Sequence, residues 1–267
     1  MPLLVDKFLA VVKRDYLTAL RQRRSFGSTA LVLVFEIMGL YFLSRAIGPR
    51  FRPEGGGYFP FVVVGVATLN FLFAGIDGFI SAIHDSQVGG TIEFMMNTAT
   101  PPFIVVMLSA MSSFLSRIFQ MTLYVGVGLM MVPLPTGHPN YLGCVAILAL
   151  SIACASSFGV LAASVQVWNQ RGSALVWLTT SIVWLLSGTM FPVVTLPATL
   201  QKVADCLPFT HSLRGLRLAL LQGSGMDPLW TPILSLLAFS LVLFPLSAWA
   251  FSLAIRNARR RGTLAFY

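Results

Sequence analysis

The sequence predicts an all-α polytopic membrane protein with six transmembrane helices, and three observations support this fold class. Hydrophobic residues make up 56% of the 267 residues and charged residues only 10%, whereas soluble domains are about 45–50% apolar and about 25% charged. The mean hydropathy is +0.81. Six apolar runs approach or exceed the roughly 20 residues that a membrane-spanning helix needs. This composition excludes a soluble enzyme, a disordered chain and a disulfide-stapled secreted module.

The six predicted spans form one permease domain over residues 28–255. Clusters of glycine and proline separate several of them, as expected for turns. The chain has no internal repeat, so an inverted-repeat carrier gains no support. A secretory signal peptide is not expected, because a long charged segment precedes the first apolar run. The runs cover residues 28–44, 58–79, 103–132, 141–167, 173–194 and 229–255.

Charged residues interrupt only the first three spans, at Glu36, Asp77 and Arg117. A charge inside a bilayer is costly and is by default a candidate functional group. One interpretation is structural, with helices oriented by an ion pair and Asp77 reaching toward the headgroups; the other is a proton relay. Because each unpaired charge should seek a partner, we expect Glu36 and Arg117 to form an ion pair within the bundle.

The distribution of basic residues predicts the orientation. Lysine and arginine number 18 against 9 acidic residues, and ten of the 18 lie in the first 27 and last 12 residues. There they flank apolar runs and can meet anionic headgroups, so we expect membrane lipids and no nucleic acid as partners. Six spans place both termini on one side, which holds eleven basic residues against six opposite. We therefore expect a cell membrane protein whose two termini, including the basic tail 256–267, lie in the cytoplasm.

Two segments are amphipathic rather than spanning. Residues 1–27 place Lys7, Arg14 and Arg21 on one face, as in a helix lying in the cytoplasmic interface. The alternative is a helix packed on other protein. Residues 196–223 are too polar to span and are divided by Pro208, so we expect two short re-entrant helices in the outer leaflet, before the last span.

The sequence lacks the common nucleotide-binding, catalytic and metal-binding motifs. The sequence contains no phosphate-binding Gly-x-x-x-x-Gly-Lys-Ser/Thr loop, no Gly-x-Ser-x-Gly and no His-Glu-x-x-His. The three histidines fall in separate loops, without the spacing of a metal site. The three cysteines form no Cys-x-x-Cys pair. We therefore expect no catalytic residue, no metal and no cofactor bound by this chain.

The segment between the second and third spans, about 81–101, carries the strongest functional signal. It lies on the predicted cytoplasmic side, yet it contains no lysine or arginine. A helix capped near Thr91 would place Glu93 in its first turn, where the helix dipole favours an anion. Its apolar, methionine-rich surface suits a partner's groove, although a loop helix tucked under the bundle is the alternative. The helix comprises Gly90, Thr91, Ile92, Glu93, Phe94, Met95 and Met96.

These residues carry a resemblance to a known family. The stretch is similar to the Gly-Thr-x-Glu-x-Leu/Met motif that opens the coupling region in permeases of type-2 class ABC exporters. One departure is Ala99, which stands where the family usually has proline. A second stretch resembles the family's last loop with its re-entrant helices: Ser187-Gly188-x-x-Phe191-Pro192-x-x-x-Leu196-Pro197, then Leu207-Pro208 and Leu213-Arg214.

The resemblance implies a transport permease rather than an enzyme. Two copies would form a homodimer around a path, and a separate ABC ATPase subunit would bind ATP. Pro192, Pro197, Pro208 and Arg214 would belong to the re-entrant loop. The expected substrate is a lipid-linked glycan or another amphipathic molecule, with a drug or small lipid as the alternative. A proton-coupled carrier and a membrane-embedded transferase are the rivals from other classes.

Overall fold

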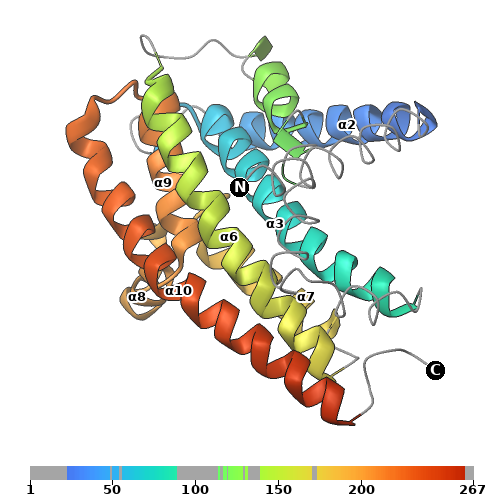
Figure 1. Ribbon diagram of the computed structural model, residues 1–267. Helices are drawn as coiled ribbons and strands as arrows, with labels where there is room; N and C mark the ends of the chain where they lie inside the picture. The colour runs from blue at the N-terminus through green and yellow to red at the C-terminus, as the bar shows by residue number, and fades with distance from the viewer. Residues whose placement is uncertain are drawn as a thin grey trace.

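The computed structural model describes residues 23–48, 50–53, 56–88, 139–169 and 173–261, together with most positions between 114 and 131. Within these ranges every secondary-structure element is a helix, as the sequence predicts (Figure 1). The named elements are α2 (Arg23–Ile47), α3 (Tyr58–Val88), α6 (Tyr141–Asn169), α7 (Ser173–Leu186), η2 (Val193–Thr195), α8 (Ala198–Asp205), α9 (Pro208–Leu220) and α10 (Met226–Arg261).

Three of the described helices are long and apolar enough to cross a membrane. They are Tyr58–His84 within α3, Tyr141–Trp168 within α6 and Met226–Ala258 within α10. The first residues of α3 and α6 are the predicted ones. Local signals explain this: Pro60 sits in the first turn of α3, where its missing N–H needs no partner, and Asn140 caps α6 by accepting a bond from the Gly143 N–H at 3.0 Å.

The fifth predicted span is wrong beyond Leu186. The α7 helix has 14 residues, about 21 Å at 1.5 Å per residue, and this falls short of a hydrocarbon core of about 30 Å. It ends because Gly188 adopts a left-handed conformation with φ of +80°, which terminates helices. The chain then turns into η2 instead of continuing to residue 194.

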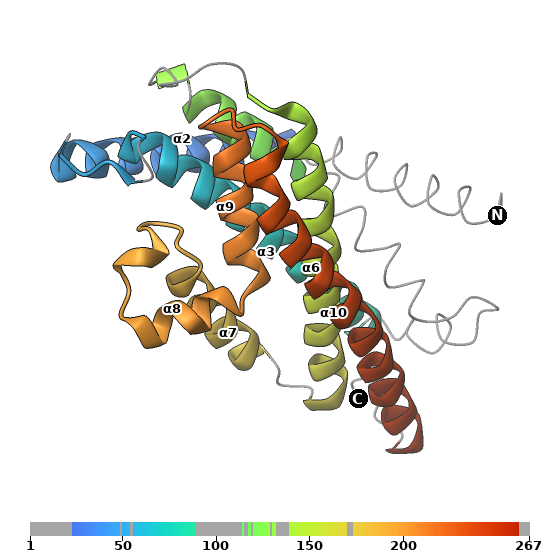
Figure 2. The ribbon, with the colours of Figure 1, turned by 90° about the vertical axis from the view of Figure 1, so that its left-hand side faces the viewer.

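Helix α2 begins at Arg23, five residues before the predicted first span. Figures 1 and 2 show it running crosswise to α3. Much of its apolar surface is exposed, including Phe35 at 65% and Phe42 at 61%. Residues 1–22 of the predicted interfacial helix and residues 89–101 of the predicted coupling region lie outside the described residues, as do large parts of the third span.

Helix α6 lies at the centre, packed against α3, α9 and α10. As expected, two short helices precede the last long one, and Pro208 begins the second of them. Helix α9 runs antiparallel along the first half of α6. The Ser151 and Ser212 hydroxyls lie 2.7 Å apart in the middle, and the Asn140 N–H donates to the Ala219 carbonyl at 2.9 Å at the far end. Figure 2 shows α9 among the long helices, while α8 stands to one side.

Candidate functional site

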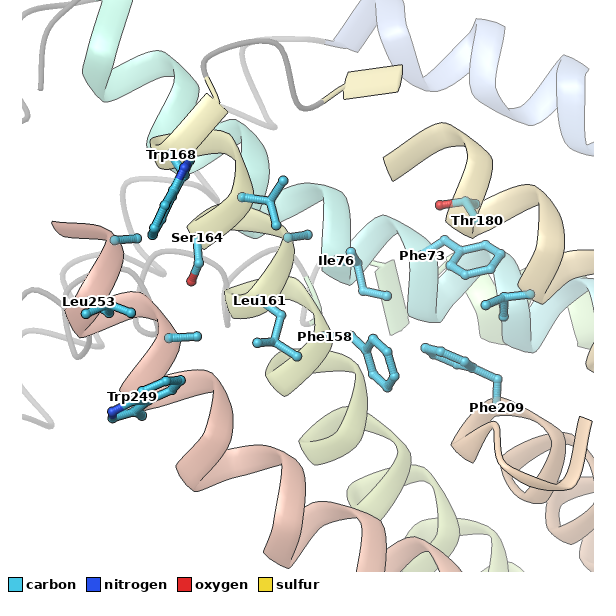
Figure 3. Close-up of a pocket in the computed structure, with 15 residues that line it drawn as sticks. Phe73, Ile76, Phe158, Leu161, Ser164, Trp168, Thr180, Phe209, Trp249 and Leu253 are labelled. Carbon is cyan, nitrogen blue, oxygen red and sulfur yellow. The ribbon is translucent and has the colours of Figure 1, made fainter. Parts of the chain in front are cut away.

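A cavity of about 660 Å³ lies between α3, α6, α7, α9 and α10 (Figure 3). Of its 15 lining residues, Ser164 and Thr180 contribute hydroxyl groups, and the other side chains are aliphatic or aromatic. No lining residue is ionisable. The Ser164 hydroxyl already donates to the Val160 carbonyl at 2.7 Å. The cavity can therefore bind an apolar body, but its lining supplies no group for acid, base or nucleophilic chemistry.

Three phenylalanine rings close one end of the cavity, at the start of α9. Phe209 is 2% exposed, and its ring centroid lies 5.8 Å from that of Phe73 and 5.2 Å from that of Phe158. Figure 3 shows these three rings grouped together. Tilted aromatic pairs at such distances add about 0.5–1.5 kcal/mol each beyond burial. This end of the cavity is consequently well packed.

Two tryptophans stand at the opposite end. Trp168 on α6 is 56% exposed and Trp249 on α10 is 60% exposed, and Figure 3 shows both far from Phe209. Tryptophan combines a large apolar ring with one N–H donor and is enriched where apolar and polar surroundings meet. The tryptophan end of the cavity is therefore its exposed end, and the end at Phe209 is its buried one.

A buried arginine lies on the same helix as Phe209. Arg217 is 3% exposed. Its Nη1 donates to the Gly188 carbonyl and its Nη2 to the Thr189 carbonyl, both at 2.9 Å, and its Nε donates to the Phe61 carbonyl at 3.3 Å. The guanidinium carbon lies 3.5 Å from the Phe61 ring centroid. One side chain thus joins α9, α3 and the turn after α7.

Sequence reasoning missed Arg217 and selected Arg214 instead, which is exposed. A signal was available, since Arg217 follows Leu213 by four residues and Phe209 by eight, so all three share one face of a helix. An arginine on an apolar face is a candidate for burial with partners. Of the prolines selected from the loop, Pro208 is buried at the start of α9 and Pro197 is exposed before α8. Pro192 precedes η2.

The intramembrane charges are not brought together as predicted. Glu36 accepts a hydrogen bond from the Asn70 side chain at 3.2 Å, and Arg117 donates to the Gln120 side chain at 2.8 Å. Within the described part of the chain, the expected ion pair between Glu36 and Arg117 is absent. Each charged group has a neutral side-chain amide as its hydrogen-bond partner instead. None of the three charged residues, Asp77 included, lines the cavity.

The geometry defines a class of protein: a helical membrane protein whose described residues form an apolar cavity and gather no cluster of metal-ligating side chains. The family model for the ABC-2 type transporter matches residues 6–221. The chain therefore belongs to the ABC-2 type transporter family. It is a multi-pass membrane protein and a transport permease without catalytic activity of its own, and the family implies an ABC ATPase as its partner. No curated protein matches the chain.

Proposed function

We propose that this permease exports an amphipathic molecule whose apolar part occupies the cavity lined by α3, α6, α7, α9 and α10. The single observation that carries the proposal is the cavity itself. Its volume of about 660 Å³ lies within the roughly 300–1,000 Å³ typical of small-molecule sites. Its lining offers apolar contact almost everywhere, and Trp168 and Trp249 at one end are exposed. An apolar group could therefore enter at this end from the surrounding lipid.

The proposed substrate is either a lipid-linked glycan or a drug or small lipid. Both carry an apolar part that such a lining would accept. Sugar hydroxyls need several hydrogen-bond partners when they leave water, and the lining offers only the two hydroxyls and the tryptophan N–H groups. In the case of a glycan, the cavity would hold the lipid portion while the sugars passed elsewhere, for example between two subunits.

The remaining machinery completes the proposal. Two copies form a homodimer in the cell membrane, and each subunit has six membrane helices, of which the short α7 is the fifth. Both termini lie in the cytoplasm, and the basic segments 1–27 and 256–267 lie on anionic lipid. The Gly90–Met96 segment docks on the ATPase, which binds ATP. The support for this docking is the resemblance of the segment to the family's coupling motif.

Transport in reconstituted vesicles tests the proposal. The permease is purified with its co-purifying ATPase, and the export of a fluorescent phospholipid and of a lipophilic dye is measured with and without ATP. We expect ATP-dependent export of at least one probe, because the permease has no other energy source under the proposal. Export that needs a proton gradient instead of ATP would support the rival carrier, with Glu36 or Asp77 as its relay.

A cavity-filling substitution tests the location. Ala162→Trp places a large ring among the lining residues and should reduce export of the probe at least about tenfold if the apolar part binds there. Ala238→Trp is the matched control, because Ala238 is exposed on α10 and does not line the cavity. Equal export by the two variants would show that the substrate does not bind in this cavity.

A further inference from the structure

Three of the elements that line the cavity meet again at Arg217. Helix α3 contributes Phe73 to the cavity, α7 contributes Val183, and α9 contributes Phe209. Arg217 lies eight residues beyond Phe209 on α9, and its partners lie on α3 before Phe73 and in the turn directly after α7. The arginine therefore stands at the end of the cavity region toward the N-terminus of α3.

The contacts of Arg217 suit a clamp between separate segments. A guanidinium is planar and holds several donors in fixed directions, whereas a lysine ammonium is a point charge on a flexible stem. Here the planar group donates to carbonyls of two segments that are more than 100 residues apart in the sequence, at Phe61 and at Gly188–Thr189. At 3% exposure, little water can compete for those carbonyls.

Glycine at position 65 leaves room for the guanidinium between α3 and the Gly188–Thr189 turn. A Cβ atom on Gly65 would lie 2.5 Å from Nη2 of Arg217 and 2.7 Å from the Thr189 carbonyl oxygen. Only glycine therefore permits the present approach of α3 to the turn. The turn is itself shaped for the contact: Gly188 has a φ of +80°, and the buried Ser187 and Thr189 hydroxyls lie 2.9 Å apart.

We propose that Arg217 is a positioning residue of the permease, which fastens the Gly188–Thr189 turn and α9 to α3 and so keeps this end of the cavity closed. Arg217 makes these contacts whichever molecule is exported, so the test needs no substrate.

Thiol protection in the full chain, within its native complex in membranes, tests the proposal. Cys144 and Cys206 are replaced by serine, and Thr189, which is fully buried, is replaced by cysteine. The T189C thiol reports opening of the turn. Native Cys154, 1% exposed on α6, reports general unfolding. N-ethylmaleimide labelling of each site is followed by mass spectrometry in R217Q, in R217K and in the exposed-arginine control R214Q.

We expect R217Q to raise the labelling rate of the T189C thiol about tenfold or more, a factor that corresponds to about 1.4 kcal/mol. Labelling of Cys154 should stay unchanged. R217K should give a smaller increase, because one ammonium can still reach one carbonyl, and R214Q should match the parent. G65A, which keeps the arginine and displaces its guanidinium, should reproduce the selective increase.

Two results would overturn the proposal. If R217Q leaves the T189C thiol as protected as in the parent, the turn does not depend on the arginine. If Cys154 becomes labelled in parallel with the T189C thiol, Arg217 is required for folding in general and holds no particular segment. Should R217Q fail to accumulate in the membrane, the same two criteria are applied to R217K and G65A.

Discussion

Asn140 should hold the beginning of α6 to the end of α9, and its removal has a calculable cost. Its side-chain oxygen accepts a hydrogen bond from the Gly143 N–H at 3.0 Å, which caps α6. Its side-chain nitrogen donates to the Ser224 carbonyl at 3.0 Å, in the connection between α9 and α10. Asn140→Ala removes both bonds but retains the backbone bond to Ala219.

The two lost bonds can be assigned separate magnitudes. Loss of an asparagine cap costs about 1 kcal/mol, and loss of an ordinary hydrogen bond costs about 1 kcal/mol more. Asn140→Ala should therefore destabilise this junction by about 2 kcal/mol. Asn140→Asp keeps the capping oxygen and adds a charge that a helix N-terminus favours, but it loses the donor to Ser224, so it should cost about 1 kcal/mol.

Hydrogen exchange read by mass spectrometry measures these differences locally. Amides in the first turns of α6 should exchange about 30-fold faster in Asn140→Ala and about fivefold faster in Asn140→Asp, because exchange tracks the free energy of local opening. Asn70→Ala on α3 is the control and should leave α6 unchanged. Equal exchange in the alanine and aspartate variants would refute the division into cap and tether, and unchanged exchange in Asn140→Ala would refute both.

Three further predictions concern other parts of the chain. Glu93→Lys should uncouple ATP hydrolysis from transport while the protein still inserts, as measured by both rates in reconstituted vesicles. Replacing Lys7, Arg14 and Arg21 together by glutamine should weaken anchoring on anionic lipid by about 1 kcal/mol per charge, as measured by lipid protection of spin labels on residues 3–24. Gly159→Ala should lower the free energy of unfolding by about 1–3 kcal/mol, because a Cβ at this position would lie 2.9 Å from a ring carbon of Phe79 on α3. Thermal unfolding measures the loss.

Two of these predictions have a matched control variant, and the prediction on the three cations has a result that would contradict it. Glu93→Gln removes the charge without reversing it and should uncouple less than Glu93→Lys; intact coupling in both would dismiss the segment as the transmission element. Spin labels equally exposed to water with and without the three cations would contradict the interfacial helix. Gly126→Ala, where a Cβ meets nothing within 4 Å, should not share the destabilisation of Gly159→Ala.

Local signals predicted the helical architecture well. The starts of α3 and α6, the absence of strands from the described residues and the break at Pro208 all agree with what the apolar runs and one proline predicted. The end of α7 was missed, although Gly188 was visible in the sequence. The surrounding residues are apolar, so composition continued the span past the glycine that ends the helix.

Long-range contacts were not predictable from the sequence in the same way. Three hydrogen bonds of Arg217 go to backbone carbonyls, and a backbone carbonyl has no sequence signature. The Glu36–Arg117 pairing was predicted because an unpaired charge in a bilayer is costly. That prediction left out neutral amides. Asn70 on the adjacent α3 donates a hydrogen bond to the Glu36 carboxylate. The partner of each charged side chain depends on how the helices cross, and the crossing geometry cannot be derived from a single sequence.

The placement of polar groups bears on what the permease can select. Asn140, Ser151 and Arg217 each form a side-chain hydrogen bond that connects α9 or its flanking turns to a neighbouring helix. Few polar side chains remain to face the cavity. An apolar pocket discriminates weakly, by about 10–200-fold per methylene group, whereas a site built to bond a polar group rejects analogues far more strongly. A permease that binds its substrate in this cavity should therefore select by size and shape, and should accept apolar groups of similar volume.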